Sequence, residues 1–130
     1  MTAFIDTNVP IYAFTNDPRA ERAKQVLTDG GIISVQVLNE FASVAIRKLR
    51  MPWPRITEAI AMLCFRFDPV RPVTIATHEA ALVLARDHGL SFYDALIVAA
   101  AQEAGCDTLM TEDLQAGRRF GPVQVVNPFV

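Results

Sequence analysis

The chain has few of the residues that build common metal and nucleophile sites. Its two cysteines, Cys64 and Cys106, lie in apolar surroundings and lack metal-ligand spacing. The two histidines, His78 and His88, have no metal-type or cysteine partner nearby in the sequence. With only six glycines, the chain contains neither a glycine-rich phosphate loop nor a GxSxG elbow. We therefore expect two reduced thiols in a cytoplasmic protein and look elsewhere for chemistry.

Long apolar runs and a strong net charge are also missing. The longest apolar run, Ala95–Ala101, is far too short to cross a bilayer, and no basic segment followed by an apolar one opens the chain. We expect no membrane segment and no signal peptide. The formal net charge of −2 does not by itself indicate a polyanion binder. A chain of 130 residues, 52% hydrophobic and 20% charged, predicts one globular domain over residues 1–130.

Short apolar segments alternate with helical patterns along the chain. We predict strands at Ala3–Ile5, Ile32–Ile33, Val70–Ile75, Asp107–Thr111 and Val123–Val126. We predict helices at Val9–Phe14, from Asp17–Pro18 to about Leu27, after Ser34, after Pro54, from a Thr77 cap to His88 and from Ser91 to Gly105. This alternation is typical of an α/β fold with a parallel sheet and helices on both of its faces.

Four acidic residues occupy positions that such a sheet brings together. Asp6 ends the first strand and Asp113 follows the fourth, while Glu40 and Asp94 lie near the N-terminal ends of helices. The carboxyl ends of parallel strands and the starts of the following helices share one side of the fold. Converging carboxylates repel one another, and a divalent cation removes that conflict. Oxygen ligands favour Mg²⁺, with Mn²⁺ possible, and such a cation can activate water for phosphodiester hydrolysis.

Each of these acids also has a purely local interpretation. Asp6 could cap the helix that follows it. Asp94 fits a variant capping box with Ser91, in which both side chains satisfy helix amides. Glu40 could be a surface residue beside an apolar stripe, and Asp113 could belong to a turn or cap a short helix. Local sequence alone leaves both interpretations open for each position.

Basic residues gather in one part of the chain despite the negative net charge. Ten of the twelve cations are arginine, and Arg47, Lys48, Arg50 and Arg55 lie close together. Arginine matches phosphate geometry well, which favours RNA contact. A solvated helix end, where cations interact favourably with the helix dipole, explains the first three equally well.

Four spaced motifs, AFIDTN, VLNEF, SFYDALIVAAA and LMTEDL, together with a closing VVNPF, resemble PIN-domain ribonucleases. More narrowly, the chain resembles the VapC-type toxin of a toxin–antitoxin pair. The resemblance implies a five-stranded parallel sheet of order 3-2-1-4-5 and a Mg²⁺-dependent endoribonuclease. It also implies a cognate antitoxin and a homodimer. The implied acidic site is Asp6, Glu40 and Asp94, with Asp113 at a position that the family fills with Asp or Asn, and with Asn8 and Thr111 lining the cleft.

Other functions remain compatible with the same residues. A PIN nuclease of RNA processing would need no antitoxin, and a non-catalytic binding module would need no chemistry. A phospho-acceptor switch of the receiver type also places an aspartate at a strand end. That architecture needs a late lysine, whereas the only lysines here, Lys24 and Lys48, are early. The RNA that would be cleaved is not indicated by the sequence.

Overall fold

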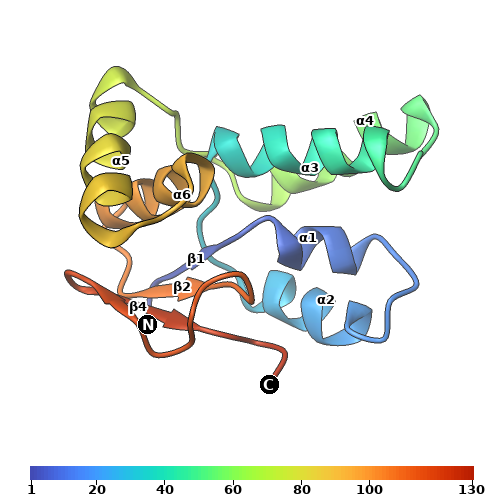
Figure 1. The fold of residues 1–130 in the computed structure, drawn as a ribbon. Coiled ribbons are helices and arrows are strands. Elements are labelled where there is room, and N and C mark those ends of the chain that lie inside the picture. The colour runs from blue at the N-terminus through green and yellow to red at the C-terminus, as the bar shows by residue number, and fades with distance from the viewer.

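The computed structural model describes residues 1–130 as a small sheet with helices packed beside and above it (Figure 1). The helices are α1 (Asn8–Ala13), α2 (Ala20–Asp29), α3 (Val35–Arg47), α4 (Trp53–Arg66), α5 (Ile75–His88) and α6 (Phe92–Glu103). The strands are β1 (Ala3–Ile5), β2 (Thr108–Met110), β3 (Arg119–Phe120) and β4 (Val123–Val126). Helices α5 and α6 lie at one end of the molecule and α1 to α4 at the other.

The sheet has the order β1-β2-β4-β3. Strands β1, β2 and β4 run parallel, and β3 pairs antiparallel with β4 through the turn at Gly121, whose φ is +61°. Beyond β1, single parallel bridges join Phe4 to Ile32 and Ser34 to Arg71. With these bridges included, the five predicted segments lie in the predicted order 3-2-1-4-5, and β3 is an additional strand at the far edge.

The prediction of a strand over Val70–Ile75 was wrong for most of its length. Only Arg71 makes a bridge there, and helix α5 already begins at Ile75. The cap of α5 is Thr74 rather than the predicted Thr77. Thr74 accepts a hydrogen bond from the Thr77 N–H, and the Thr77 hydroxyl accepts one from the Thr74 N–H. This reciprocal pair satisfies amides at the helix start and moves it upstream.

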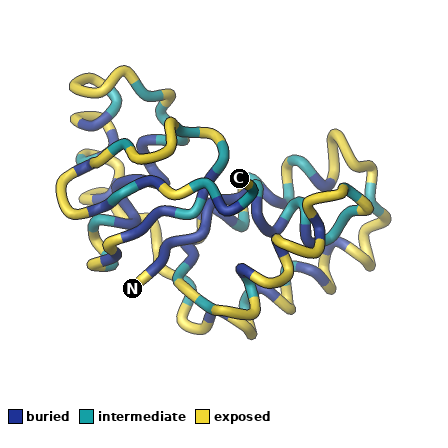
Figure 2. The backbone as a smooth tube through the Cα atoms, turned by 90° about the horizontal axis from the view of Figure 1, so that it is seen from below, coloured by how far each residue is buried: buried dark blue, intermediate teal, exposed yellow.

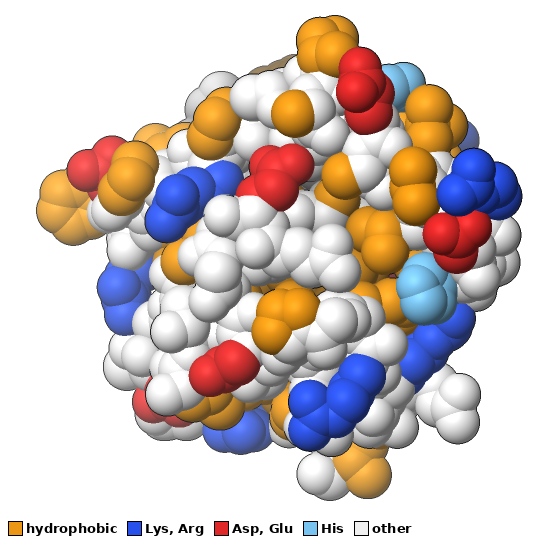
Figure 3. All heavy atoms as spheres, turned by 90° about the vertical axis from the view of Figure 1, so that its left-hand side faces the viewer, with side chains coloured by type: hydrophobic (Ala, Val, Ile, Leu, Met, Phe, Trp, Pro, Cys, Tyr) orange, Lys and Arg blue, Asp and Glu red, His pale blue; other side chains and the backbone are white.

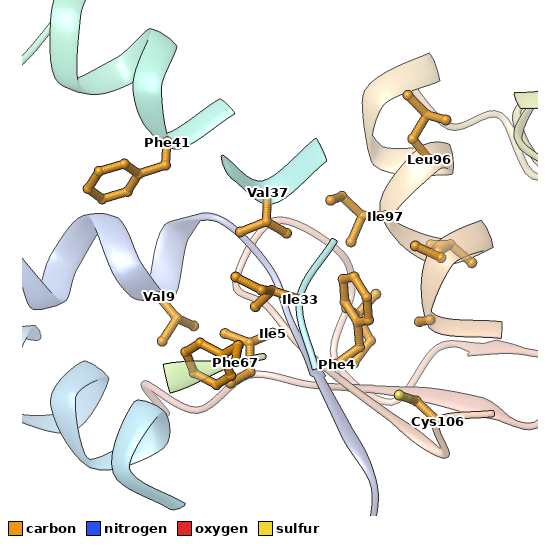
Figure 4. Packing of buried hydrophobic residues seen from close by; sticks show 14 of the residues in the cluster. Phe4, Ile5, Val9, Ile33, Val37, Phe41, Phe67, Leu96, Ile97 and Cys106 are labelled. Carbon is orange, nitrogen blue, oxygen red and sulfur yellow. The ribbon is translucent and has the colours of Figure 1, made fainter. Parts of the chain in front are cut away.

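One hydrophobic core joins the sheet to the helices. Figure 4 shows Phe4 and Ile5 from β1 packed beside Val37 of α3 and Ile97 of α6. The whole Ala95–Ala101 segment of α6 is buried, which explains why its apolar run shows no helical periodicity. Burial is concentrated along the strands and inner helix faces, while helix ends are exposed (Figure 2). The first strand is therefore held from several sides, so the residue that follows it is rigidly placed.

The surface agrees with the modest net charge. On the face shown in Figure 3, acidic and basic side chains are interspersed with hydrophobic ones. Both cysteines are free as expected, although Cys64 is only partly buried. None of the helices combines the length and the apolar character that crossing a membrane requires.

Candidate active site

Asp6 lies directly after β1 and is 4% exposed. Its N–H still donates to the Met110 carbonyl, so the sheet fixes its backbone. Its carboxylate accepts hydrogen bonds from the Thr7 N–H at 2.6 Å and the Thr111 hydroxyl at 2.8 Å. The residue at the N-cap of α1 is Thr7, and no side chain caps that helix. Asp6 therefore does not cap α1, and its carboxylate is held at the sheet edge instead.

A hydrogen-bond network connects Asp6 to Asp113. Besides donating to Asp6, the Thr111 hydroxyl accepts from the Asn8 amide nitrogen at 3.1 Å and from the Asp113 N–H at 3.0 Å. The same Asn8 nitrogen donates to the Asp113 carboxylate at 3.1 Å. The amide oxygen of Asn8 is buried without a partner. The structure thus brings four of the predicted site residues together, the acids Asp6 and Asp113 being linked through the side chains of Thr111 and Asn8.

Glu40 and Asp94 approach this network from helices. The Glu40 carboxylate of α3 accepts a hydrogen bond from the Thr7 hydroxyl at 3.3 Å. At the start of α6, the Ser91 hydroxyl accepts from the Asp94 N–H at 3.3 Å. The reciprocal bond, from the Ser91 N–H to the Asp94 carboxylate, is absent. Ser91 therefore caps α6 without the second bond of a capping box, and its side chain also forms a hydrogen bond with the Asp94 carboxylate that works against the rise in the pKa of Asp94.

Asp6, Glu40 and Asp94 all have raised pKa values, and the charge of a neighbouring acid contributes to each shift. The pKa of Asp6 is raised to about 6, mainly by burial and also by the charges of Asp113 and Asp94, while the hydrogen bonds from Thr7 and Thr111 lower it. Burial and the Asp6 charge raise the pKa of Glu40 to about 7. Burial and the Asp113 charge also raise the pKa of Asp94. No cation offsets these shifts. We call Asp6, Glu40, Asp94 and Asp113 the carboxylate cluster.

The donor set of this cluster fits a magnesium ion. Its ligands are carboxylate oxygens, joined by the unpartnered amide oxygen of Asn8. No three acidic, histidine or cysteine side chains are arranged closely enough to hold a metal ion directly. Mg²⁺ retains several waters and needs only one or two direct carboxylates. The wide spacing and the raised pKa values are both compatible with such a partly hydrated cation.

Glu112, next to Asp113 in the sequence, is used differently. Its carboxylate accepts hydrogen bonds from the Tyr12 hydroxyl and from Arg19, the latter at 3.3 Å. Arg19 also binds Asp17 at 2.8 Å, and its guanidinium lies 4.1 Å from the centre of the Tyr12 ring. We call Tyr12, Asp17, Arg19 and Glu112 the arginine clamp. It ties the loop that carries Asp113 to α1 and to the start of α2.

A groove of about 420 Å³ opens beside Glu40, between α3 and the start of α6. Its lining includes Gln36, Asn39, Glu40, Ser43, Arg47 and Tyr93, and we call it the α3 groove. Of the four basic residues predicted to contact RNA, this groove includes only one. Arg47 of α3 lines the groove. Arg55, near the start of α4, does not line it and instead donates a hydrogen bond to the Phe14 carbonyl at 3.2 Å. Lys48 and Arg50 are exposed and line no part of it.

Several residues of the site were not predicted from the sequence. Thr7 binds both Asp6 and Glu40, yet a threonine after a strand looked like an ordinary turn residue. The contact of Arg19 with Glu112 spans 93 positions and has no local signal. Gln36, Asn39 and Ser43 of the groove were also missed, although a signal existed: they share one helical face of α3 with the predicted Glu40 and Arg47.

The chain resembles known proteins in both sequence and fold. The PIN domain family model matches residues 3–119. The chain is similar to a solved toxin–antitoxin complex from Klebsiella pneumoniae, with 23% identity, 98% of both chains covered and a TM-score of 0.74. It is similar to Mycobacterium tuberculosis VapC20, a Sarcin-Ricin loop cleaving toxin, with 23% identity over 86% of this chain and 92% of that one and a TM-score of 0.72. VapBC2 from Rickettsia felis, bound to promoter DNA, gives 16% identity, 96% and 97% coverage and a TM-score of 0.67. Comparison with curated proteins gives no match.

Proposed function

This chain belongs to the PIN-domain family, and we propose that it is a Mg²⁺-dependent endoribonuclease, the toxin of a toxin–antitoxin pair. One observation supports this proposal most strongly. Three carboxyls of the cluster have raised pKa values, no cationic side chain neutralises them, and a groove opens beside them. Leaving acids in this state destabilises a fold unless a cation binds there.

The proposed roles follow from where each side chain is held. Asp6 and Asp94 would hold the cation, assisted by Glu40 and Asp113. A bound divalent cation would lower the pKa of a water and offset charge on the phosphate oxygens. Thr111 and Asn8 fix the carboxylates of Asp6 and Asp113 through hydrogen bonds, so neither acid is free to rotate away.

The partners belong to the same proposal. One of the similar solved structures is described as a toxin–antitoxin complex and another as VapBC2 bound to promoter DNA. The third is described as a toxin that cleaves the Sarcin-Ricin loop. These descriptions support a cognate antitoxin and an RNA substrate for this chain, and we propose that the antitoxin inhibits cleavage by covering the site. A homodimer and a cytoplasmic location remain predictions from the sequence.

Cleavage of a labelled RNA tests the proposed activity. We expect the purified chain to cut single-stranded RNA with Mg²⁺ or Mn²⁺ and to stop when EDTA removes the metal. The folded Asp94→Asn variant, purified in the same way, controls for contaminating nucleases. Equal cutting by the two proteins, or cutting that persists in EDTA, would contradict the assignment.

A further inference from the structure

The α3 groove contains side chains that the proposed cleavage chemistry does not use, and Gln36 is the most informative. Only 7% of this residue is exposed, yet no hydrogen bond in the structure involves its amide group. The buried polar atoms without a partner are the Asn8 amide oxygen and the Ser34 hydroxyl, so the Gln36 amide is not sealed from solvent. Because Gln36 lines the groove, its donor and its acceptor are both available to a ligand there.

Tyr93 lies across the groove at the start of α6. It is 60% exposed and immediately precedes Asp94 of the carboxylate cluster. Its hydroxyl has no hydrogen-bond partner in the structure. An exposed aromatic ring beside a polar groove is the usual platform on which single-stranded nucleic acids stack their bases.

Arg47 marks the other end of the groove. It follows Glu40 by seven residues on α3, which corresponds to about 10 Å along the helix axis. Arg47 is exposed and forms no ion pair with an acidic residue, unlike Arg19 of the clamp. A free guanidinium is the side chain best suited to bind a phosphate through two parallel hydrogen bonds.

We propose that the α3 groove is a subsite for one nucleotide of single-stranded RNA, next to the bond that is cut. Its base stacks on Tyr93, the Gln36 amide hydrogen-bonds the base edge, and Arg47 binds a phosphate. The inference rests on the proposed ribonuclease function, because Glu40 of the carboxylate cluster lines the groove and Asp94 follows Tyr93 directly. Single-stranded RNA is required because paired bases cannot present both a free face and a free edge to these side chains.

Binding of short fluorescein-labelled RNAs, measured by fluorescence anisotropy without divalent cations, tests the subsite apart from cleavage. We expect Tyr93→Ala to weaken binding about tenfold and Tyr93→Phe, which keeps the ring, to bind like wild type. Phe65→Ala is the matched control, since Phe65 is an exposed aromatic residue on α4, away from the groove. Equal binding by Tyr93→Ala and Phe65→Ala would overturn the stacking role.

The base-edge contact has its own test. Gln36→Leu keeps a similar volume and removes the amide. Against oligoadenylate, oligouridylate and oligocytidylate, we expect it to reduce the differences in affinity between bases, whereas Tyr93→Ala weakens all three. Unchanged preferences in Gln36→Leu would contradict base recognition by Gln36. Circular dichroism and size-exclusion chromatography establish that each variant keeps its fold and oligomeric state.

The two proposals fail in distinguishable ways. If wild type binds RNA through Tyr93 and Gln36 but cuts nothing with Mg²⁺, the subsite stands and the ribonuclease proposal fails. If wild type cuts RNA and both variants bind and cut like wild type, the ribonuclease stands and the subsite is wrong. If wild type shows no affinity for any of these RNAs, the subsite is also wrong.

Discussion

The carboxylate cluster and the arginine clamp lie side by side, and the pKa values of their acids are shifted in opposite directions. In the clamp, hydrogen bonds from Arg19 lower the pKa of Asp17 to about 2. In the cluster, burial and neighbouring acids raise the pKa of Asp6 to about 6. The two residues have the same side chain, so the difference comes from their surroundings: Asp6 is buried among other acids, whereas Asp17 is partly exposed to solvent and bound by an arginine. An arginine accompanies the acids of the clamp and no cationic side chain accompanies those of the cluster, which is the arrangement that the proposed metal site requires.

The largest expected effect comes from removing one charge in each region. Asp94→Asn should reduce RNA cleavage by more than about 100-fold, since even residues that only support metal ligands reach that range. The metal-free variant should be no less stable than wild type, because one repelling charge is gone. Asp17→Asn, the matched change in the clamp, should keep most activity. Initial rates of RNA cleavage measure both, and near-wild-type rates for folded Asp94→Asn would remove it from the site.

Neighbouring acids in one loop sharpen the same contrast. Asp113→Asn should lower cleavage, because Asp113 contributes to the cluster, although its amide can still bind Asn8. Glu112→Gln should leave most cleavage intact while loosening the bonds to Tyr12 and Arg19. The ratio of the two rates is the readout. Equal losses would mean that position in the loop matters more than partnership with arginine.

The stability of the metal-free protein should fall as the pH rises. An acid whose pKa is higher in the folded state binds protons more tightly there, so its stabilising contribution is lost between its unfolded and folded pKa values. For Asp6 this window runs from about 4 to about 6, and the shift corresponds to about 3 kcal/mol. Urea unfolding between about pH 4 and about pH 8 in EDTA measures this loss of stability. Glu40, with a folded pKa near 7, extends the decline upward.

Replacing Asp6 tests the origin of this pH dependence. Asp6→Asn should flatten the decline, because its side chain no longer titrates. Asp17 acts with the opposite sign: its lowered pKa contributes stability above about pH 4 that is lost toward pH 2. Its contribution is therefore constant across the measured range. A decline as steep in Asp6→Asn as in wild type would show that other groups cause it.

The smallest effect concerns the split of the basic residues. Arg47→Gln should reduce the slope of log affinity for RNA against log salt by about one, the value for one lost phosphate contact. Arg55→Gln should leave the slope unchanged, because that side chain is engaged with the Phe14 carbonyl. Titrations at several salt concentrations give both slopes. Equal slopes for the two variants would contradict a phosphate contact that Arg47 makes and Arg55 does not.

The sequence was enough to predict that the acids lie at one edge of the sheet, because this depends only on where strands end and helices begin. A buried apolar strand followed by Asp6 fixes one edge of a parallel sheet, and helix starts bring Glu40 and Asp94 to that edge. What it missed depends on contacts between distant segments, such as Arg19 with Glu112. The expected strand up to Ile75 failed for a different reason. There the reciprocal Thr74–Thr77 cap favoured a helix over the β-propensity of the apolar residues.

The orientation of buried polar side chains was equally out of reach. Helical spacing places Gln36 on the same face of α3 as Glu40. It does not predict whether the Gln36 amide forms a hydrogen bond. The local pattern around Ser91 and Asp94 fitted a capping box, and only the geometry shows that Ser91 caps alone. Both outcomes depend on how α3 and α6 pack together, which no window of sequence contains.

Thermal melts with and without Mg²⁺ test the central claim, that the carboxylate cluster lacks its own cation because it binds a metal ion. The account predicts that millimolar Mg²⁺ or Mn²⁺ raises the melting temperature of wild type by mass action. Asp17→Asn should show the same increase, and Asp94→Asn and Asp6→Asn should lose most of it. A wild-type melting temperature unchanged by either ion, or an equal increase in all four proteins, would contradict the account.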